Sequence, residues 1–148
     1  MAIHCYLGID VGTQGLTALL VESAISNSNN DNNDDDDDDD DDDGDDNNKS
    51  SLKVLSIGEG SYDFVPDLPD GCYEQNPLDW ETALVDALKK IQDDKDVDID
   101  NIAIEAICVT GQMHGCVMID SNGRSIGTAR LWCDARNQEE VRTVTFQS

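Results

Sequence analysis

Apolar residues alternate with other residues along the start of the chain, which is the pattern of a half-buried β-strand. The alternating positions are Ile3, Cys5, Leu7, Ile9 and Val11. A second apolar run spans residues 16–21 and a third spans 52–60. Glycines at positions 12 and 15 permit a tight reversal between the first two runs. The pattern therefore predicts three strands, each paired with the one before it.

The spacing of apolar residues changes to that of a helix within residues 73–91. Asn76 suits the N-cap, Pro77 suits the first helical position, and the lysines at 89 and 90 suit the negative end of a helix. The apolar side chains that recur at helical spacing are Trp80, Leu84, Ala87, Leu88 and Ile91. This segment predicts an amphipathic helix with Trp80 as an anchor in the core.

The last third of the chain predicts shorter elements. An apolar run over residues 101–111 predicts a buried strand, and residues 116–120 predict another. Ser121, Asn122 and Gly123 are typical of a tight turn. A short strand follows within 126–132 and the opening of a helix within 133–144. Because no helix stop follows, we expect the chain to be truncated at its C-terminal end.

An acidic segment interrupts these elements between the second and third strands. From Asn27 to Asn48 every residue is Asn, Asp, Ser or Gly, and this stretch holds 13 of the 33 acidic residues. Without it, 20 acidic residues face nine basic ones, so the net charge of −24 becomes −11. We expect residues 27–48 to form a disordered insert with no direct part in catalysis. The acidic remainder disfavours partners such as nucleic acid and anionic membranes.

The same segment contains a partial match to a calcium-binding loop. Asp39, Asp41, Asp43 and Gly44 fit the start of the pattern, but Ser50 occupies the position that requires a glutamate ligand. Loose cation condensation is the favoured interpretation. An acidic chaperone or calcium buffer is a weak alternative, since it ignores every motif outside the insert.

Cysteine usage and hydropathy favour a cytoplasmic protein. The five cysteines form no CxxC pair, which argues against a disulfide framework or a zinc site. The sequence contains neither an apolar run near the ~18 residues of a membrane span nor a secretory signal pattern.

Two short motifs could carry chemistry. Asp10, Gly12 and Thr13 follow the first strand, where a carboxylate can hold Mg²⁺ and glycine and threonine can approach a phosphate. Met113 and His114 lie between two glycines in VTGQMHGCVMID, residues 109–120, and would project from a tight loop. Taken alone, each motif is more simply explained as an ordinary turn.

Four segments together resemble the FGGY family of carbohydrate kinases. They are residues 8–21, 73–84, 109–120 and 131–141, and their order and spacing match the family once the acidic insert is set aside. Gln-Met-His-Gly at 112–115, combined with the LWCDAR segment, looks most like the xylulokinase branch. The resemblance implies an incomplete FGGY N-terminal domain over residues 1–148. It also implies an α/β fold of the actin/hexokinase/Hsp70 (ribonuclease H-like) type, whose mixed sheet has an antiparallel N-terminal hairpin and flanking helices.

The resemblance also assigns roles to residues. Asp10, Gly12 and Thr13 would face the ATP phosphates, with Asp10 at Mg²⁺. The substrate-binding residues would be Gln112, Met113, His114 and Asp134. Asp134 and Arg136 would either contact the ligand or form a supporting ion pair, and we favour the ion pair. Trp132 is expected in the core rather than as a stacking platform.

The implied activity is ATP-dependent phosphorylation of D-xylulose or a related ketose. Another sugar or polyol of the family, such as sedoheptulose, is the nearest alternative. In the family the catalytic aspartate lies beyond residue 148, so we expect this chain alone to be inactive. A non-catalytic fragment or binding module is the alternative from another class, and a homodimer of the full-length enzyme stays open.

Overall fold

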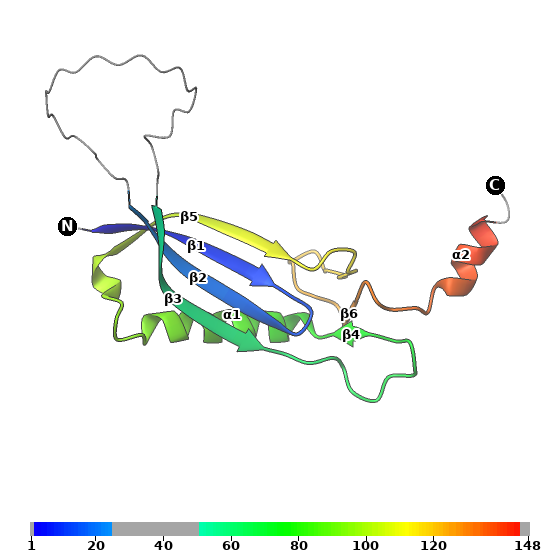
Figure 1. Cartoon of the computed structure of the whole chain (residues 1–148). Helices are drawn as coiled ribbons and strands as arrows, with labels where there is room; N and C mark the ends of the chain where they lie inside the picture. The colour runs from blue at the N-terminus through cyan, green and yellow to red at the C-terminus, as the bar shows by residue number, and fades with distance from the viewer. Residues whose placement is uncertain (1, 25–50, 146–148) are drawn as a thin grey trace, which may run out of the picture.

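The computed structural model describes residues 2–24 and 51–145 of the chain, and the acidic insert with its calcium-loop match lies outside them. A twisted sheet is covered on one face by a long helix (Figure 1). The elements, in chain order, are β1 (Ile3–Val11), β2 (Gly15–Ala24), β3 (Ser51–Ser61), β4 (Glu74–Gln75), α1 (Pro77–Gln92), the short 3-10 helix η1 (Ile99–Asn101), β5 (Ile102–Gly111), β6 (Ala129–Arg130) and α2 (Gln138–Thr145).

The main sheet has four strands in the order β3-β2-β1-β5. β2 pairs antiparallel with both β1 and β3, whereas β1 pairs parallel with β5. The predicted hairpin and the pairing of the third strand on the second are therefore confirmed. β4 and β6 form a separate two-stranded ribbon, antiparallel, that joins the start of α1 to the last third of the chain.

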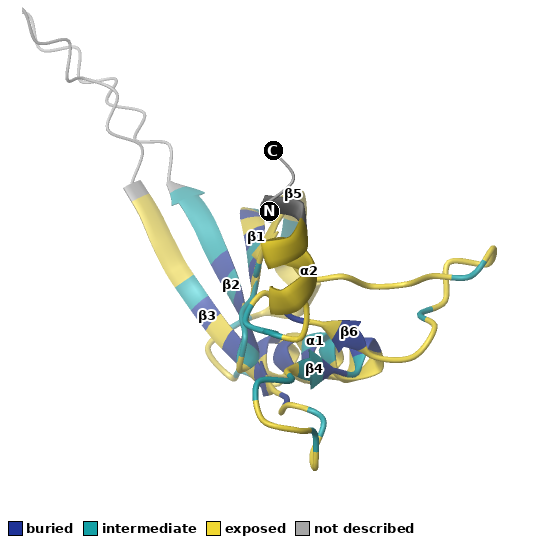
Figure 2. Ribbon diagram, turned by 90° about the vertical axis from the view of Figure 1, so that its right-hand side faces the viewer, coloured by how far each residue is buried: buried dark blue, intermediate teal, exposed yellow. Residues whose placement is uncertain are grey.

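The core lies between the sheet and α1, as the alternation in β1 predicts. Cys5, Leu7 and Ile9 are buried on that face, and Figure 2 shows the alternation of buried and exposed positions along the strands. The remaining buried members of this core are Leu16, Ala18, Leu20, Tyr62, Ala83, Ala87 and Ile91. Trp80 packs against the core but is only partly buried.

Helix α1 begins and ends as its sequence predicts. The side chain of Asn76 accepts a hydrogen bond from the Leu78 amide at 3.2 Å, and Pro77 opens the helix. The helix crosses β3 where Gly58 and Gly60 face Ala83 and Ala87. Because neither glycine has a side chain, the helix backbone lies directly on the strand.

The strand predicted over residues 101–111 is present as β5, but the prediction that it is buried is wrong. β5 is an edge strand, and Ile107 and Val109 are 60% and 64% exposed. The reason is that α1 packs on β2 and β3 and does not extend over β5. On the sheet face away from α1, Tyr6 and Ile57 are also exposed.

The predicted strand over residues 116–120 is also wrong. Cys116 forms an isolated bridge with Arg130, and Ile119 forms another with Ser125. The tight turn that follows is confirmed, because the Asp120 carboxylate accepts the amides of Asn122 and Arg124 at 2.8 and 2.9 Å. These bonds close the turn locally without a continuous ladder.

The C-terminal helix begins at Gln138, within the segment predicted to open a helix, and lies away from the sheet (Figure 1). Within residues 2–24 and 51–145, no helix is long and apolar enough to cross a membrane.

Candidate functional site

Two short loops meet at the end of the sheet where β1 and β5 finish. β1 and β5 are parallel neighbours, so the turn after β1 (residues 12–14) and the loop after β5 (residues 112–115) lie side by side. The Gln112 amide donates to the Val11 carbonyl at 2.9 Å and continues the ladder past the end of β5. Open α/β sheets bind ligands outside the carboxyl ends of their strands, which makes this end the candidate site.

The turn after β1 is held by a tyrosine that the sequence did not single out. The Tyr62 hydroxyl lies 2.5 Å from the Gly12 carbonyl oxygen and 3.0 Å from that of Gly15. Burial raises the pKa of the Tyr62 phenol, and the nearby charge of Asp10 raises it further. Tyr62 therefore stays protonated and donates to the turn. An aromatic residue just after a strand carries no signal of this role.

A network of side-chain amides joins the two loops. The Gln75 side chain donates to the Thr13 carbonyl at 2.6 Å and accepts from the Gln112 amide at 3.0 Å. The Thr13 hydroxyl donates to the side-chain oxygen of Gln112 at 3.3 Å, which closes a ring of three residues. The Trp80 indole adds a fourth bond, to the side-chain oxygen of Gln75 at 3.0 Å. The sequence did not single out Gln75 either.

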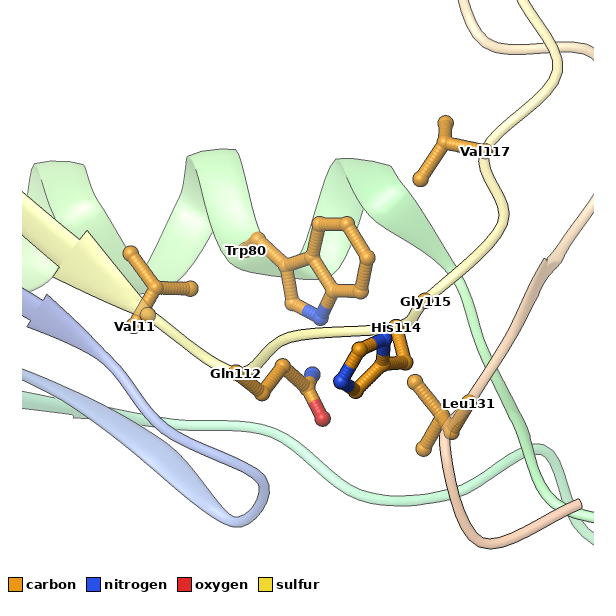
Figure 3. Close-up of a pocket in the computed structure, with 8 residues that line it drawn as sticks. Val11, Trp80, Gln112, His114, Gly115, Val117 and Leu131 are labelled. Carbon is orange, nitrogen blue, oxygen red and sulfur yellow. The ribbon is translucent and has the colours of Figure 1, made fainter.

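Beside this network lies an open hollow of about 200 Å³. It is lined by Val11, Trp80, Gly111, Gln112, His114, Gly115, Val117 and Leu131, and Figure 3 shows Trp80 projecting from α1 and His114 from the loop. Of the predicted sugar-binding residues, Gln112 and His114 line the hollow. Met113 is not among the lining residues, and its side chain is 73% exposed.

His114 adopts an unusual backbone conformation. Its φ is +61°, the left-handed region that costs a non-glycine residue roughly 1–2 kcal/mol. Only Asp67 shares a positive φ among the described non-glycine residues. Strain of this kind concentrates at functional sites. The His114 side chain lies beside the hollow in this conformation (Figure 3).

Asp10 is the second-last residue of β1, and it pairs with Thr17 on β2 and with Thr110 on β5. Its side chain is exposed and, among the described residues, forms no hydrogen bond or ion pair. The structure gathers no group of three potential metal ligands in residues 2–24 and 51–145. Asp10 is therefore a single free carboxylate beside the Gly12–Thr13 turn.

Asp134 and Arg136 form an ion pair that also involves Glu74. The Arg136 Nε lies 2.9 and 3.0 Å from the two Asp134 carboxylate oxygens, and its guanidinium also contacts Glu74. The same carboxylate accepts the Tyr73 amide at 2.9 Å, and its side chain is only 6% exposed. Arg136 lowers the pKa of Asp134 far below its ordinary value. This arrangement favours the supporting role for Asp134 over ligand contact.

The same pair holds Glu74 in place. Thr128 and then Arg136 lower the pKa of Glu74 by hydrogen bonding to its carboxylate. Because Glu74 belongs to β4 and Thr128 precedes β6, the ion pair fastens the small ribbon beside the site.

The prediction that Trp132 belongs to the core is wrong. Its side chain is 59% exposed, and its indole nitrogen donates to the Thr13 hydroxyl at 3.4 Å. The preceding residue, Leu131, occupies the buried position of this segment, so alternation turns Trp132 outward to the site edge.

Comparison with known proteins gives one family. Residues 52–147 match the model of the FGGY family of carbohydrate kinases, N-terminal domain. The chain is 28% identical over 137 residues to the xylulose kinase of Haemophilus influenzae, covering 91% of this chain and 22% of that protein. It is 35% identical over 78 residues to the xylulose kinase of Bacillus subtilis, covering 51% of this chain and 15% of that protein.

Among solved structures, the chain is similar to a xyloylose kinase from Brucella ovis. The TM-score is 0.66 at 26% identity, over 95% of this chain and 23% of that one. The predicted actin/hexokinase-like α/β fold with a mixed sheet is thereby confirmed. The chain spans about a fifth of the length of the relatives it matches.

Proposed function

Because the chain belongs to the FGGY family of carbohydrate kinases, we propose that it forms the N-terminal, sugar-binding part of an ATP-dependent ketose kinase. D-xylulose is the substrate we favour, since the chain is similar to proteins named xylulose kinase. The observation that carries the proposal is the contact between the two loops, in which the Thr13 hydroxyl donates to Gln112 at 3.3 Å. A group that binds phosphate and a group that binds sugar must be adjacent for phosphoryl transfer.

The sugar side of the site is the loop after β5. His114 and Gln112 line the hollow, and each can donate or accept a hydrogen bond with a sugar hydroxyl. Val11, Val117 and Leu131 supply an apolar wall suited to the carbon face of a sugar. Met113, exposed beside the hollow, would contact a substrate only from its open side.

The phosphate side is the turn after β1. Asp10 and Thr13 fit ATP and Mg²⁺, because Mg²⁺ is commonly held by one or two carboxylates together with waters and phosphate oxygens. The free carboxylate of Asp10 meets that requirement without a second protein ligand. Bound Mg²⁺ would neutralise phosphate charge during transfer. Gly12, in the same turn, is the third residue that we assign to the phosphate side.

We further propose that the FGGY N-terminal domain begins at residue 1 and is interrupted by the acidic insert at 27–48. The relative from Haemophilus influenzae supports this boundary, because its alignment covers 91% of the chain. The insert lies between β2 and β3, while the site lies at the ends of β1 and β5. A cytoplasmic location fits a reaction that consumes ATP, and we expect no nucleic-acid or membrane partner.

The test joins this chain to a relative. The chain replaces the segment of the Haemophilus influenzae xylulose kinase with which it aligns, and ATP turnover is measured with D-xylulose, sedoheptulose and glycerol. We expect turnover with D-xylulose, loss of that turnover in His114→Ala, and none in the chain alone. His4→Ala is the matched control, since His4 is the only other histidine and pairs with Glu105 at 2.5 Å, outside the site.

Three results would contradict the proposal in different ways. Turnover with glycerol but no ketose would reject the substrate. Equal activity of His114→Ala and His4→Ala would reject the sugar-binding role of the loop. Binding of D-xylulose by the chain, with no turnover in a folded fusion, would favour a non-catalytic binding module.

A further inference from the structure

Gln75 is a neutral polar side chain buried almost completely, with 1% exposure. It stands in β4, directly before the N-cap of α1. Burying an amide costs a few kcal/mol unless its groups are hydrogen-bonded. All of its polar atoms have partners in this structure, and those partners come from three different segments.

The chemistry of the partners fixes the orientation of the Gln75 amide. A backbone carbonyl only accepts and an indole N–H only donates. The amide nitrogen must therefore face the Thr13 carbonyl, and the amide oxygen must face the Trp80 indole. That oxygen also accepts from Gln112, so the Gln112 amide nitrogen points at Gln75 and its oxygen points at Thr13.

The Thr13 hydroxyl completes a chain of hydrogen bonds that we call the relay. It links Trp80, Gln75, Gln112, Thr13 and Trp132. The hydroxyl carries one proton, which it donates to the Gln112 oxygen, and it accepts from the Trp132 indole at 3.4 Å. If the hydroxyl turned to donate to a phosphate oxygen, the Gln112 oxygen would lose its donor. Gln112 lines the hollow, and its side-chain oxygen could then accept from a sugar hydroxyl.

We propose that Gln75 is a positioning residue that couples the turn after β1 to the loop after β5, acting through Thr13 and Gln112. Phosphate on one loop then favours sugar on the other, and the coupling is reciprocal. The ligand part of this inference rests on the proposed function. The relay itself is a property of the chain and can be measured without any ligand.

The chain contains two built-in reporters of the relay. Trp80 and Trp132 are its only tryptophans, and their indole N–H groups contact Gln75 and Thr13 respectively. Each gives one indole signal in a ¹H–¹⁵N NMR spectrum, and a Trp132→Phe variant assigns them. Gln75 and Trp132 share no hydrogen bond, whereas each is hydrogen-bonded to Thr13, so we expect Gln75 to act on the Trp132 signal through Thr13.

The first variant is Gln75→Glu, which keeps the shape and the acceptor oxygen but loses the donor to the Thr13 carbonyl. We expect the Trp132 signal to move while the helix content of the chain is unchanged. The matched control is Gln92→Glu, the same change at an exposed position at the end of α1. A Trp132 signal that stays in place in folded Gln75→Glu would overturn the relay.

The second variant, Thr13→Val, tests the relay in the opposite direction and keeps it falsifiable if Gln75→Glu fails to fold. Val preserves the branched shape but removes the hydroxyl, so the Trp80 signal should move although Thr13 and Trp80 share no side-chain hydrogen bond. An unmoved Trp80 signal would overturn the proposal.

The ligand arm uses D-xylulose and inorganic phosphate as probes on the same chain. We expect phosphate to tighten D-xylulose binding, and Gln75→Glu to abolish that effect and weaken D-xylulose binding about tenfold, the equivalent of one hydrogen bond. Indole signals that respond to the variants, with no binding of D-xylulose to the parent chain, would reject the proposed substrate and leave the relay intact. Binding of D-xylulose that phosphate does not alter would overturn the coupling.

Discussion

The backbone of Ala87 occupies the space where a side chain on Gly58 would begin. A Cβ placed on Gly58 would stand 1.9 Å from the Ala87 carbonyl oxygen, far inside any contact distance. Helix α1 and strand β3 therefore approach backbone to backbone, and the helix that carries Trp80 is seated by this contact.

We expect Gly58→Ala to lower the free energy of unfolding by about 3 kcal/mol or more, because the neighbouring atoms belong to a helix backbone that cannot yield locally. Chemical denaturation of both proteins measures the difference. Gly8→Ala is the matched control, since its nearest neighbour would be the Leu19 Cβ at 3.9 Å. That variant should keep or raise stability by up to about 1 kcal/mol. Equal stability of the two variants would contradict the close approach.

Asn76→Ala should lower the free energy of unfolding by about 1 kcal/mol, because the Leu78 amide loses its cap. Asn76→Asp keeps the acceptor oxygen and adds a charge that the N-terminus of a helix favours. It should therefore leave stability unchanged or slightly higher. Thermal unfolding followed by circular dichroism compares the three proteins, and a loss of the same size in both variants would show that the cap does not operate.

The Asp134–Arg136 pair should make stability depend on pH. Because Arg136 lowers the pKa of the Asp134 carboxyl, the folded chain binds fewer protons than the unfolded chain near pH 4, the usual range of an aspartate. The pair therefore stabilises the fold above about pH 4, and this contribution disappears as the pH falls. The gap in stability between the parent and Asp134→Asn should be wide at pH 7 and shrink towards pH 3.

Urea titrations at several pH values measure that gap. Asp86→Asn, at an exposed position on α1, is the control and should show a much smaller gap at pH 7. A gap for Asp134→Asn that is constant from pH 7 to pH 3 would contradict the ion pair.

The left-handed backbone conformation of His114 should lower the stability of the parent chain. We expect His114→Gly to be more stable than His114→Ala by about 1 kcal/mol, because only alanine would still strain the left-handed backbone. Both variants lose the imidazole, so both should bind D-xylulose more weakly than the parent chain. Thermal unfolding and calorimetric titration give the two quantities. Alanine and glycine variants of equal stability would show that the positive φ carries no strain.

The sequence predicted the hairpin and α1 because their signals are local. Alternation in β1 and the cap at Asn76 each need only a few neighbouring residues to form. The burial of β5 was mispredicted because an apolar strand looks the same whether or not a helix covers it. Only the packing of α1 on β2 and β3 decided the outcome.

The same distinction between local and distant signals separates the site residues that were predicted from those that were missed. His114 and Gln112 were predicted because glycines and a familiar motif surround them. Gln75 and Tyr62 were missed because their roles come from contacts with residues 37 to 62 positions away. No window of sequence around either residue contains those partners. Trp132 was assigned to the core, whereas its direction depends on which neighbour takes the buried position.

The ladder between β2 and β3 continues to Ala24 and Ser51, which pair directly across the two strands. Paired residues of an antiparallel ladder lie about 5 Å apart, so the chain leaves and re-enters the sheet at almost the same point. Engineers look for this geometry when they splice one protein into another. A reporter domain whose own termini lie close together could replace residues 25–50 and leave the register of the sheet, and the loops at the far ends of β1 and β5, as they are.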